Sequence, residues 1–211
     1  MNPRESLDLL VGSALCLGTL LFFVFQVMAA PASPLEVIQS GTERGLQIIK
    51  NSLSGAGPAL DQRREEILII VDEYFDFGEM SRRSLGRPWK DQPPNKQQEF
   101  VALFKQLLFN TYVSRIEAAA TPTTRIDYDQ EKIEGEHALV RTRAVNDQKP
   151  PVQIDYRLRA ESAGWKVYDV VIEGVSLISN YREQFASVLS SESFDSLIKR
   201  LREKVAKQAT L

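Results

Sequence analysis

The chain has 211 residues, of which 43% are hydrophobic and 26% are charged, and its formal net charge at pH 7 is −2. This near balance excludes the strongly basic surface that typical nucleic-acid-binding domains present. The single cysteine and the single histidine are too few for a disulfide framework or an ordinary zinc site. The composition therefore predicts a globular domain held together by an apolar core.

The N-terminal segment has the features of an export signal. Residues 9–25 form a run without charge, and residues 30–32 (Ala-Pro-Ala) have the small-x-small form of a signal-peptidase site. The run is also nearly long enough to span a bilayer. Residues 1–32 are therefore predicted to be a cleaved signal peptide or an uncleaved membrane anchor, and residues 33–211 to form one domain outside the cytoplasm.

Apolar residues recur at helical spacing before residue 120 and again near the C-terminus. Gly86 and Pro88 mark the end of a short helix, and Asp91 with the two prolines after it marks the start of a long one. The predicted helices cover residues 35–53, about 59–77, a short stretch within 77–89, 91–119, about 177–189 and 193–208.

From residue 124 the period of the apolar pattern changes to two, which predicts strands. The turns between them are short, so an antiparallel meander is expected. Helices that are separate in sequence from a four-stranded sheet indicate a single α+β domain. The predicted strands cover residues 124–133, 136–147, 151–161 and 164–173.

The fourth predicted strand has apolar side chains on both of its faces. Strict alternation places Trp165, Val167 and Val171 on one face. It places Tyr168, Val170 and Ile172 on the other. An antiparallel strand normally keeps one face polar, so the second apolar face predicts a further apolar contact.

Two strand aspartates, Asp155 and Asp169, are candidates for a catalytic base in an apolar cavity. Asp155 shares its face with two arginines, which favours a surface ion pair, and for Asp169 a structural hydrogen bond is the favoured interpretation. His137 lies at a turn-to-strand junction and is interpreted as an exposed structural residue. A small acidic cluster spreads around a helix and indicates a solvated face rather than a metal site: Asp72, Glu73 and Asp76.

Several arginines gather around the short helix. Arg82, Arg83 and Arg87 lie beside it, and Arg115 lies near the end of the long helix. Two interpretations remain open, namely surface salt bridges, or attraction to phosphate headgroups or to an acidic partner surface.

Three stretches carry a resemblance to a known family: FDFGEMSRRSLGRPW (75–89), QQEFVALFKQLLFNTYVSRI (97–116) and GWKVYDVVIEGVSLISNYREQF (164–185). In their order and spacing they resemble the MlaC family, the soluble periplasmic phospholipid-binding component of the Mla lipid-transport system. Members are also known as toluene-tolerance or ABC-transporter auxiliary proteins. The resemblance covers roughly residues 35–205.

The resemblance implies a cystatin-like or nuclear-transport-factor-like α+β cone, in which helices wrap a four-stranded antiparallel sheet around an apolar lipid cavity. It implies a non-enzymatic carrier without a cofactor, located in the periplasm or tethered to the inner membrane. Such a carrier passes phospholipid between an outer-membrane lipoprotein complex and an inner-membrane ABC transporter and maintains outer-membrane lipid asymmetry. Two alternatives are a cone-fold enzyme that uses Asp169 or Asp155, and an envelope adaptor or chaperone that binds no lipid.

The broad apolar stripe between Phe100 and Tyr112 and the two-faced fourth strand offer more apolar surface than one core needs. Pattern and side-chain type therefore predict a set of cavity-lining residues, and cationic residues at the cavity mouth, where a phosphate would sit. The predicted lining residues are Phe75, Met80, Phe104, Leu108, Tyr112, Ile154, Tyr156, Val167, Val170, Ile172, Val175 and Ile178. The predicted mouth residues are Arg82, Arg83 and Arg182.

Overall fold

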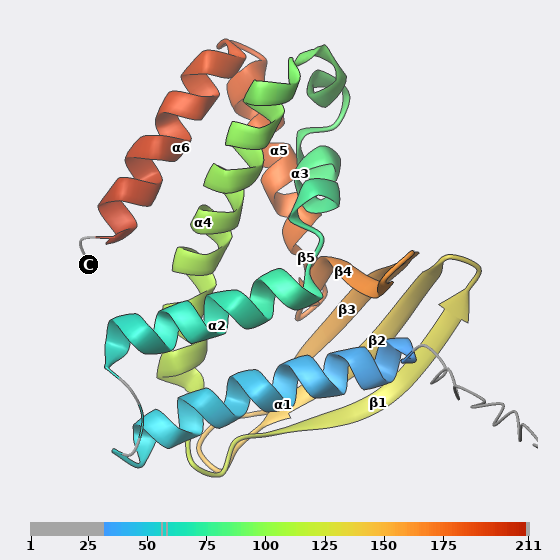
Figure 1. Cartoon of the computed structure of the whole chain (residues 1–211), viewed down its shortest axis with the longest axis vertical. Coiled ribbons are helices and arrows are strands. Elements are labelled where there is room, and N and C mark those ends of the chain that lie inside the picture. Colours follow the sequence, from blue (N-terminus) through green and yellow to red (C-terminus); the bar gives the residue numbers. More distant parts are fainter. Residues whose placement is uncertain (1–31, 56, 58, 210–211) are drawn as a thin grey trace, which may run out of the picture. The chain divides into compact units, whose positions relative to one another are not determined.

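The computed structural model describes residues 32–209 except 56 and 58 (Figure 1). Apart from its last residue, the predicted signal segment therefore lies outside the described part of the chain. Among the described residues, no helix combines the length and the hydropathy needed to cross a bilayer. The helices are α1 Pro34–Leu53, α2 Leu60–Tyr74, α3 Phe77–Leu85, the 3-10 helix η1 Arg87–Asp91, α4 Pro94–Ala119, α5 Leu177–Leu189 and α6 Phe194–Ala209. The strands are β1 Arg125–Glu134, β2 His137–Val145, β3 Val152–Glu161, β4 Gly164–Ile172 and β5 Val175–Ser176.

Helix α1 begins with a complete capping box. The Ser33 hydroxyl accepts a hydrogen bond from the Glu36 backbone N–H, and the Ser33 N–H donates to Glu36 Oε2 at 2.7 Å. Pro34 follows at the first helical position, where its missing N–H costs nothing. The helix therefore begins within two residues of the position that the apolar pattern predicts.

The second predicted helix ends earlier than its apolar pattern indicates. Phe75 leaves helix α2 in an extended conformation and forms an isolated parallel bridge with Val167 of β4. The Asp76 N–H donates to the Val167 carbonyl at 2.9 Å, and the Asp76 carboxylate then caps α3 by accepting from the Glu79 N–H. Helix α3 ends at Gly86, whose φ of 69° favours glycine. The second predicted helix thus ends at Tyr74, because a sheet contact competes with helix continuation, and the predicted short helix follows as α3.

The strands form one antiparallel meander in the order β1-β2-β3-β4-β5. This confirms the α+β class, with one difference in strand number. The two-residue strand β5 pairs with the end of β4 and leads directly into α5.

A bulge in β4 changes which of its side chains share a face. Arg157 of β3 pairs with Asp169, but the next residue, Leu158, pairs with Val167, so Tyr168 is the extra residue. Val167 and Val170 are consequently on the same face of the sheet and in the same buried cluster. The strict alternation predicted for this strand is therefore wrong: the bulge brings Val167, Val170 and Ile172 onto one face, and leaves Val171 buried on the other.

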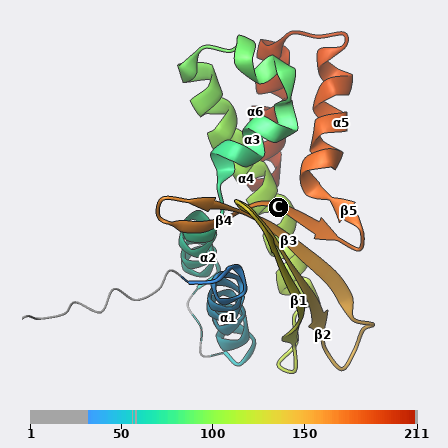
Figure 2. The same ribbon diagram turned by 90° about the vertical axis from the view of Figure 1, so that its right-hand side faces the viewer.

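The helices divide into two groups around the sheet. Helices α1 and α2 lie side by side across one face of the sheet, and α3 to α6 form a bundle beyond its β4–β5 edge (Figures 1 and 2). Two buried apolar clusters correspond to these groups. The helical core consists of Phe77, Met80, Leu85, Phe100, Phe104, Leu107, Leu108, Ile178, Tyr181, Phe185, Phe194, Leu197, Ile198 and Leu201. The sheet core consists of Ile38, Ala138, Val140, Leu158, Val167, Val170 and Leu177.

Candidate functional site

The face of the sheet that carries the sheet core, here called the inner face, is apolar but incompletely covered. Side chains from β1, β3, β4, α1, α4 and the link between α2 and α3 pack against the sheet core while keeping part of their surface exposed. Covering the exposed part of these side chains with a ligand would be favourable, because each buried CH₂ contributes about 0.8 kcal/mol. The partly exposed residues are Leu35, Val37, Phe75, Tyr112, Tyr128, Ile154, Tyr156, Trp165 and Ile172.

The predicted lining residues do not all lie at this inner face. Val167 and Val170 belong to the sheet core, and three more of the predicted residues pack against it: Ile154, Tyr156 and Ile172. Four others are buried in the helical core: Met80, Phe104, Leu108 and Ile178. Val175 is 56% exposed on β5 and belongs to neither cluster.

Two of the predicted residues, Phe75 and Tyr112, contact both cores. Phe75 does so because it leaves α2 at the bridge to β4, and Tyr112 because α4 continues past the helical core. Tyr128 and Trp165 also lie at the inner face, although they were not among the predicted lining residues. Trp165 could have been predicted from its alternation with Val167. The bulge comes after both residues, so they remain on the same face of the sheet.

Tyr156 of β3 places a phenol at this face. Burial raises its pKa well above the ordinary value, and the neighbouring Tyr128 phenol adds to the effect. The Tyr128 hydroxyl, by contrast, hydrogen-bonds to the Thr42 hydroxyl at 2.7 Å. Among the described residues, no hydrogen-bond partner is found for the Tyr156 hydroxyl. The Tyr156 hydroxyl is therefore a polar atom of the inner face that has no protein partner among the described residues.

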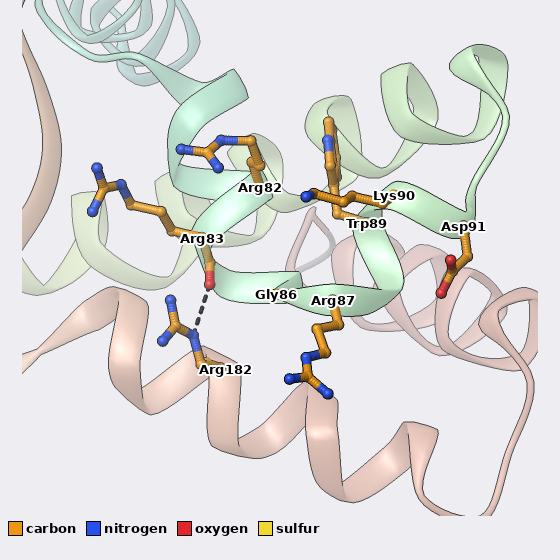
Figure 3. A pocket seen from close by; sticks show the side chains of 8 residues that line it. All are labelled: Arg82, Arg83, Gly86, Arg87, Trp89, Lys90, Asp91 and Arg182. Carbon is orange, nitrogen blue, oxygen red and sulfur yellow. Dashed lines mark hydrogen bonds between the residues drawn. The ribbon is translucent and has the colours of Figure 1, made fainter.

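The three predicted mouth residues do come together, but away from the inner face. Arg82 and Arg83 from α3 and Arg182 from α5 line a pocket of about 630 Å³ (Figure 3). The other lining residues are Gly86, Arg87, Trp89, Lys90 and Asp91. None of the predicted apolar lining residues takes part in it. We call this the cationic pocket.

A buried carboxylate holds two of the arginines in place. Glu79 accepts from Arg82 Nε at 2.7 Å and Nη2 at 2.6 Å, and from Arg83 Nε at 2.6 Å. Burial by itself raises the pKa of Glu79, but the hydrogen bonds from both guanidinium groups outweigh it and hold the pKa at about 2. Arg82 and Arg83 thus form salt bridges, which was one of the two interpretations of these arginines.

The ion pairs of Glu79 predict a loss of stability in acid. Its pKa in the folded chain lies below the ordinary 4.5, so the pairs contribute fully above that value and are lost as the pH falls toward 2. We expect Glu79→Gln to cost on the order of 1–2 kcal/mol at pH 6, after allowing for the partly exposed arginines. Urea unfolding at pH 6 and pH 2.5 measures this. The difference between wild type and variant should fall to about a quarter at pH 2.5, because Glu79 of the folded chain is only beginning to protonate there; a difference as large as at pH 6 would contradict the assignment.

The candidate catalytic aspartates lie on the opposite face of the sheet. Asp155 alternates with Ile154 and Tyr156, and Asp169 pairs directly with Arg157, so both project away from the inner face. Asp169 accepts from Arg157 Nη1 at 3.0 Å, from the Ser176 hydroxyl at 2.7 Å and from the Ile178 N–H at 3.1 Å. This is the structural hydrogen bonding expected of Asp169.

The remaining titratable candidates serve separate contacts. Asp72 pairs with Lys105, Glu73 with Arg44, and Asp76 caps α3. His137 is exposed, with its ring edge-on to Tyr168. In residues 32–209, as far as they are described, no group of histidine, cysteine and acidic side chains is placed to hold a metal ion.

The fold and the inner face define a class of protein: an α+β domain whose helices cover an apolar and partly open sheet face. The chain belongs to the MlaC family, because the sequence model of the family described as "MlaC protein" matches residues 39–203. It is 20% identical over 185 residues to the intermembrane phospholipid transport system binding protein MlaC of Haemophilus influenzae, covering 86% of each chain. It is also similar to the solved structure of a phospholipid-binding protein from Ralstonia solanacearum in complex with a phospholipid. That match has a TM-score of 0.75 and 27% identity, and covers 84% of this chain and 99% of the other.

Proposed function

We propose that this chain is a phospholipid carrier that holds acyl chains against the inner face of its sheet. The observation that carries the proposal is the ring of partly exposed apolar side chains around the sheet core. A two-tailed phospholipid has on the order of 30 methylenes, and exposing them to water costs on the order of 20 kcal/mol. A partly open apolar face between helices and sheet offers these tails an alternative to water.

The similarity to known proteins supports the same ligand. The Ralstonia solanacearum protein was solved with a phospholipid bound, and its fold spans most of this chain. The Haemophilus influenzae relative carries the name of a phospholipid transport binding protein. We therefore propose that the chain works in the periplasm, where it moves phospholipid between an outer-membrane lipoprotein complex and an inner-membrane ABC transporter.

The placement of the aspartates favours a carrier over a cone-fold enzyme. Asp155 and Asp169 face away from the apolar inner face, and Asp169 is already engaged by three donors. A general base must reach the proton that it removes from its substrate. The proposed function therefore includes no bond-making step on the lipid and requires no cofactor.

The test is native mass spectrometry of the chain, purified with its own N-terminal segment as the cell processes it, followed by extraction of the bound lipid. We expect about one phospholipid per chain, in line with an apolar face on one domain. A chain without lipid, unchanged in mass after incubation with phospholipid vesicles, would refute the carrier and favour the adaptor. The measured mass also shows whether residues 1–32 are removed.

A further inference from the structure

The cationic pocket is built from elements far apart in the chain. Helix α3 provides Arg82 and Arg83, η1 provides Arg87 and Lys90, and α5 provides Arg182. Its wall also contains Trp89, whose ring packs edge-on against Phe100 of the helical core with the ring centroids 6.4 Å apart. In Figure 3 the Arg87 side chain extends from η1 toward α5. The pocket is therefore a shared surface of three elements rather than a run of charge on one helix.

Two of its arginines are held in defined positions. The Arg182 Nε donates to the Arg83 backbone carbonyl at 2.7 Å, which leaves its terminal nitrogens available (Figure 3). The Arg83 guanidinium lies over the Tyr168 ring, 4.1 Å from its centroid, and also donates to Glu79. Side chains that are already ordered lose less entropy when a ligand binds.

The pocket keeps a positive charge that the protein does not neutralise. Five cationic side chains line the pocket, and the nearby carboxylates are those of Asp91 in the pocket and Glu79 beside it. Three positive charges are therefore in excess here, on a chain of net charge −2. Most arginines of the described residues pair with a carboxylate. Arg87, Lys90 and Arg182 have no such pair within residues 32–209 as described.

The cationic pocket shares no lining residue with the inner face. Tyr168, on which Arg83 stacks, is the bulge residue of β4, whereas Val167 and Val170 on either side of it belong to the sheet core. Behind the pocket the helical core is closed, since Met80 and Phe100 are 1% and 0% exposed. Strand β4 and the helical core therefore separate the pocket from the apolar face.

We propose that the cationic pocket docks an acidic segment of a partner protein. The inference rests on the proposed carrier function, because a carrier must dock on the proteins that load and unload it, and it adds the chemistry of that partner. Carboxylates of glutamate or aspartate side chains match the planar donors of guanidinium groups and can engage several of them together. Attraction between such opposite charges also speeds association, and it weakens as salt rises.

The experiment measures binding of a fluorescein-labelled decaglutamate peptide to the full chain, purified as the cell processes it, by fluorescence anisotropy at low and moderate salt. The test variant is Arg87→Glu/Arg182→Glu, which reverses two unpaired charges of the pocket. The matched control is Lys199→Glu/Lys204→Glu on the exposed side of α6, which changes the net charge equally. We expect the pocket variant to weaken binding about tenfold or more and the control to change it less than about twofold.

Three outcomes would overturn the docking pocket: no binding of decaglutamate by the wild type, an equal loss in both variants, or binding of phosphatidylglycerol vesicles through the same residues in preference to the peptide. The last would assign the pocket to a membrane surface. Bound phospholipid per chain is measured on the same samples by native mass spectrometry, and the pocket variant should retain it. Peptide binding by a chain that carries no phospholipid would support the docking pocket and overturn the carrier.

Discussion

Replacing Ile172 with glutamate is expected to lower the bound phospholipid to about a tenth of the wild-type level or less. Ile172 packs against the sheet core at the end of β4 and keeps part of its surface exposed. A carboxylate among acyl chains would be desolvated without a partner, which costs several kcal/mol and corresponds to more than a tenfold loss of affinity. Native mass spectrometry with quantitative lipid extraction measures the effect.

The matched control for this variant is Val175→Glu. Val175 is the β5 residue paired with Ile172, but it is 56% exposed and belongs to neither core. The control introduces the same charge at the exposed, directly paired position of the neighbouring strand, where the carboxylate stays in water, and lipid occupancy should stay near that of the wild type. Equal occupancy in the two variants, with the Ile172 variant still folded by circular dichroism, would show that the inner face does not hold the tails.

Replacing Asp169 with alanine is expected to cost about 2–3 kcal/mol of folding free energy, the largest single effect on stability that we predict outside the apolar cores. The carboxylate is 2% exposed and links Arg157 of β3 to Ser176 and to the first turn of α5. Its removal leaves the Ile178 N–H without its acceptor where the sheet joins the helical bundle. Urea unfolding monitored by circular dichroism gives the number.

Asp155→Ala provides the comparison within the same sheet face. Asp155 is also buried, but its contacts are weaker: Arg141 Nε is 3.7 Å away and the Gln153 side-chain amide donates at 3.1 Å. We expect a loss of about 1 kcal/mol or less. An Asp169 variant that loses no more than the Asp155 variant would contradict the linking role. Because neither residue faces the inner face, both variants should retain phospholipid.

The separation of the inner face from the cationic pocket has a functional consequence. The apolar side chains come from the strands of the sheet and the elements packed on them, and the cations come from α3, η1 and α5. Substitutions in one region should therefore leave the other intact. For a carrier this arrangement allows docking to remain possible whether or not lipid is bound.

Local sequence patterns determined most of the secondary structure. Helical spacing located α1, α4, α5 and α6, and the period of two located β1 to β4. These predictions succeed because the apolar face of an element must meet the core whatever its neighbours are. The motif around Trp165 also indicated the family, which the match over residues 39–203 confirms.

The tertiary structure decided what the pattern could not. Tyr168 becomes a bulge, and Phe75 leaves its helix, because pairing between strands or with a distant segment outweighs the local pattern. Arg83 and Arg182 meet although 99 positions separate them. Val175 was predicted to line the cavity, but it is exposed, because β5 is the last strand in the order of pairing and forms an edge of the sheet. Residue type and spacing thus determined which side chains are apolar or charged, and only the packing of distant segments decided which of them share a surface.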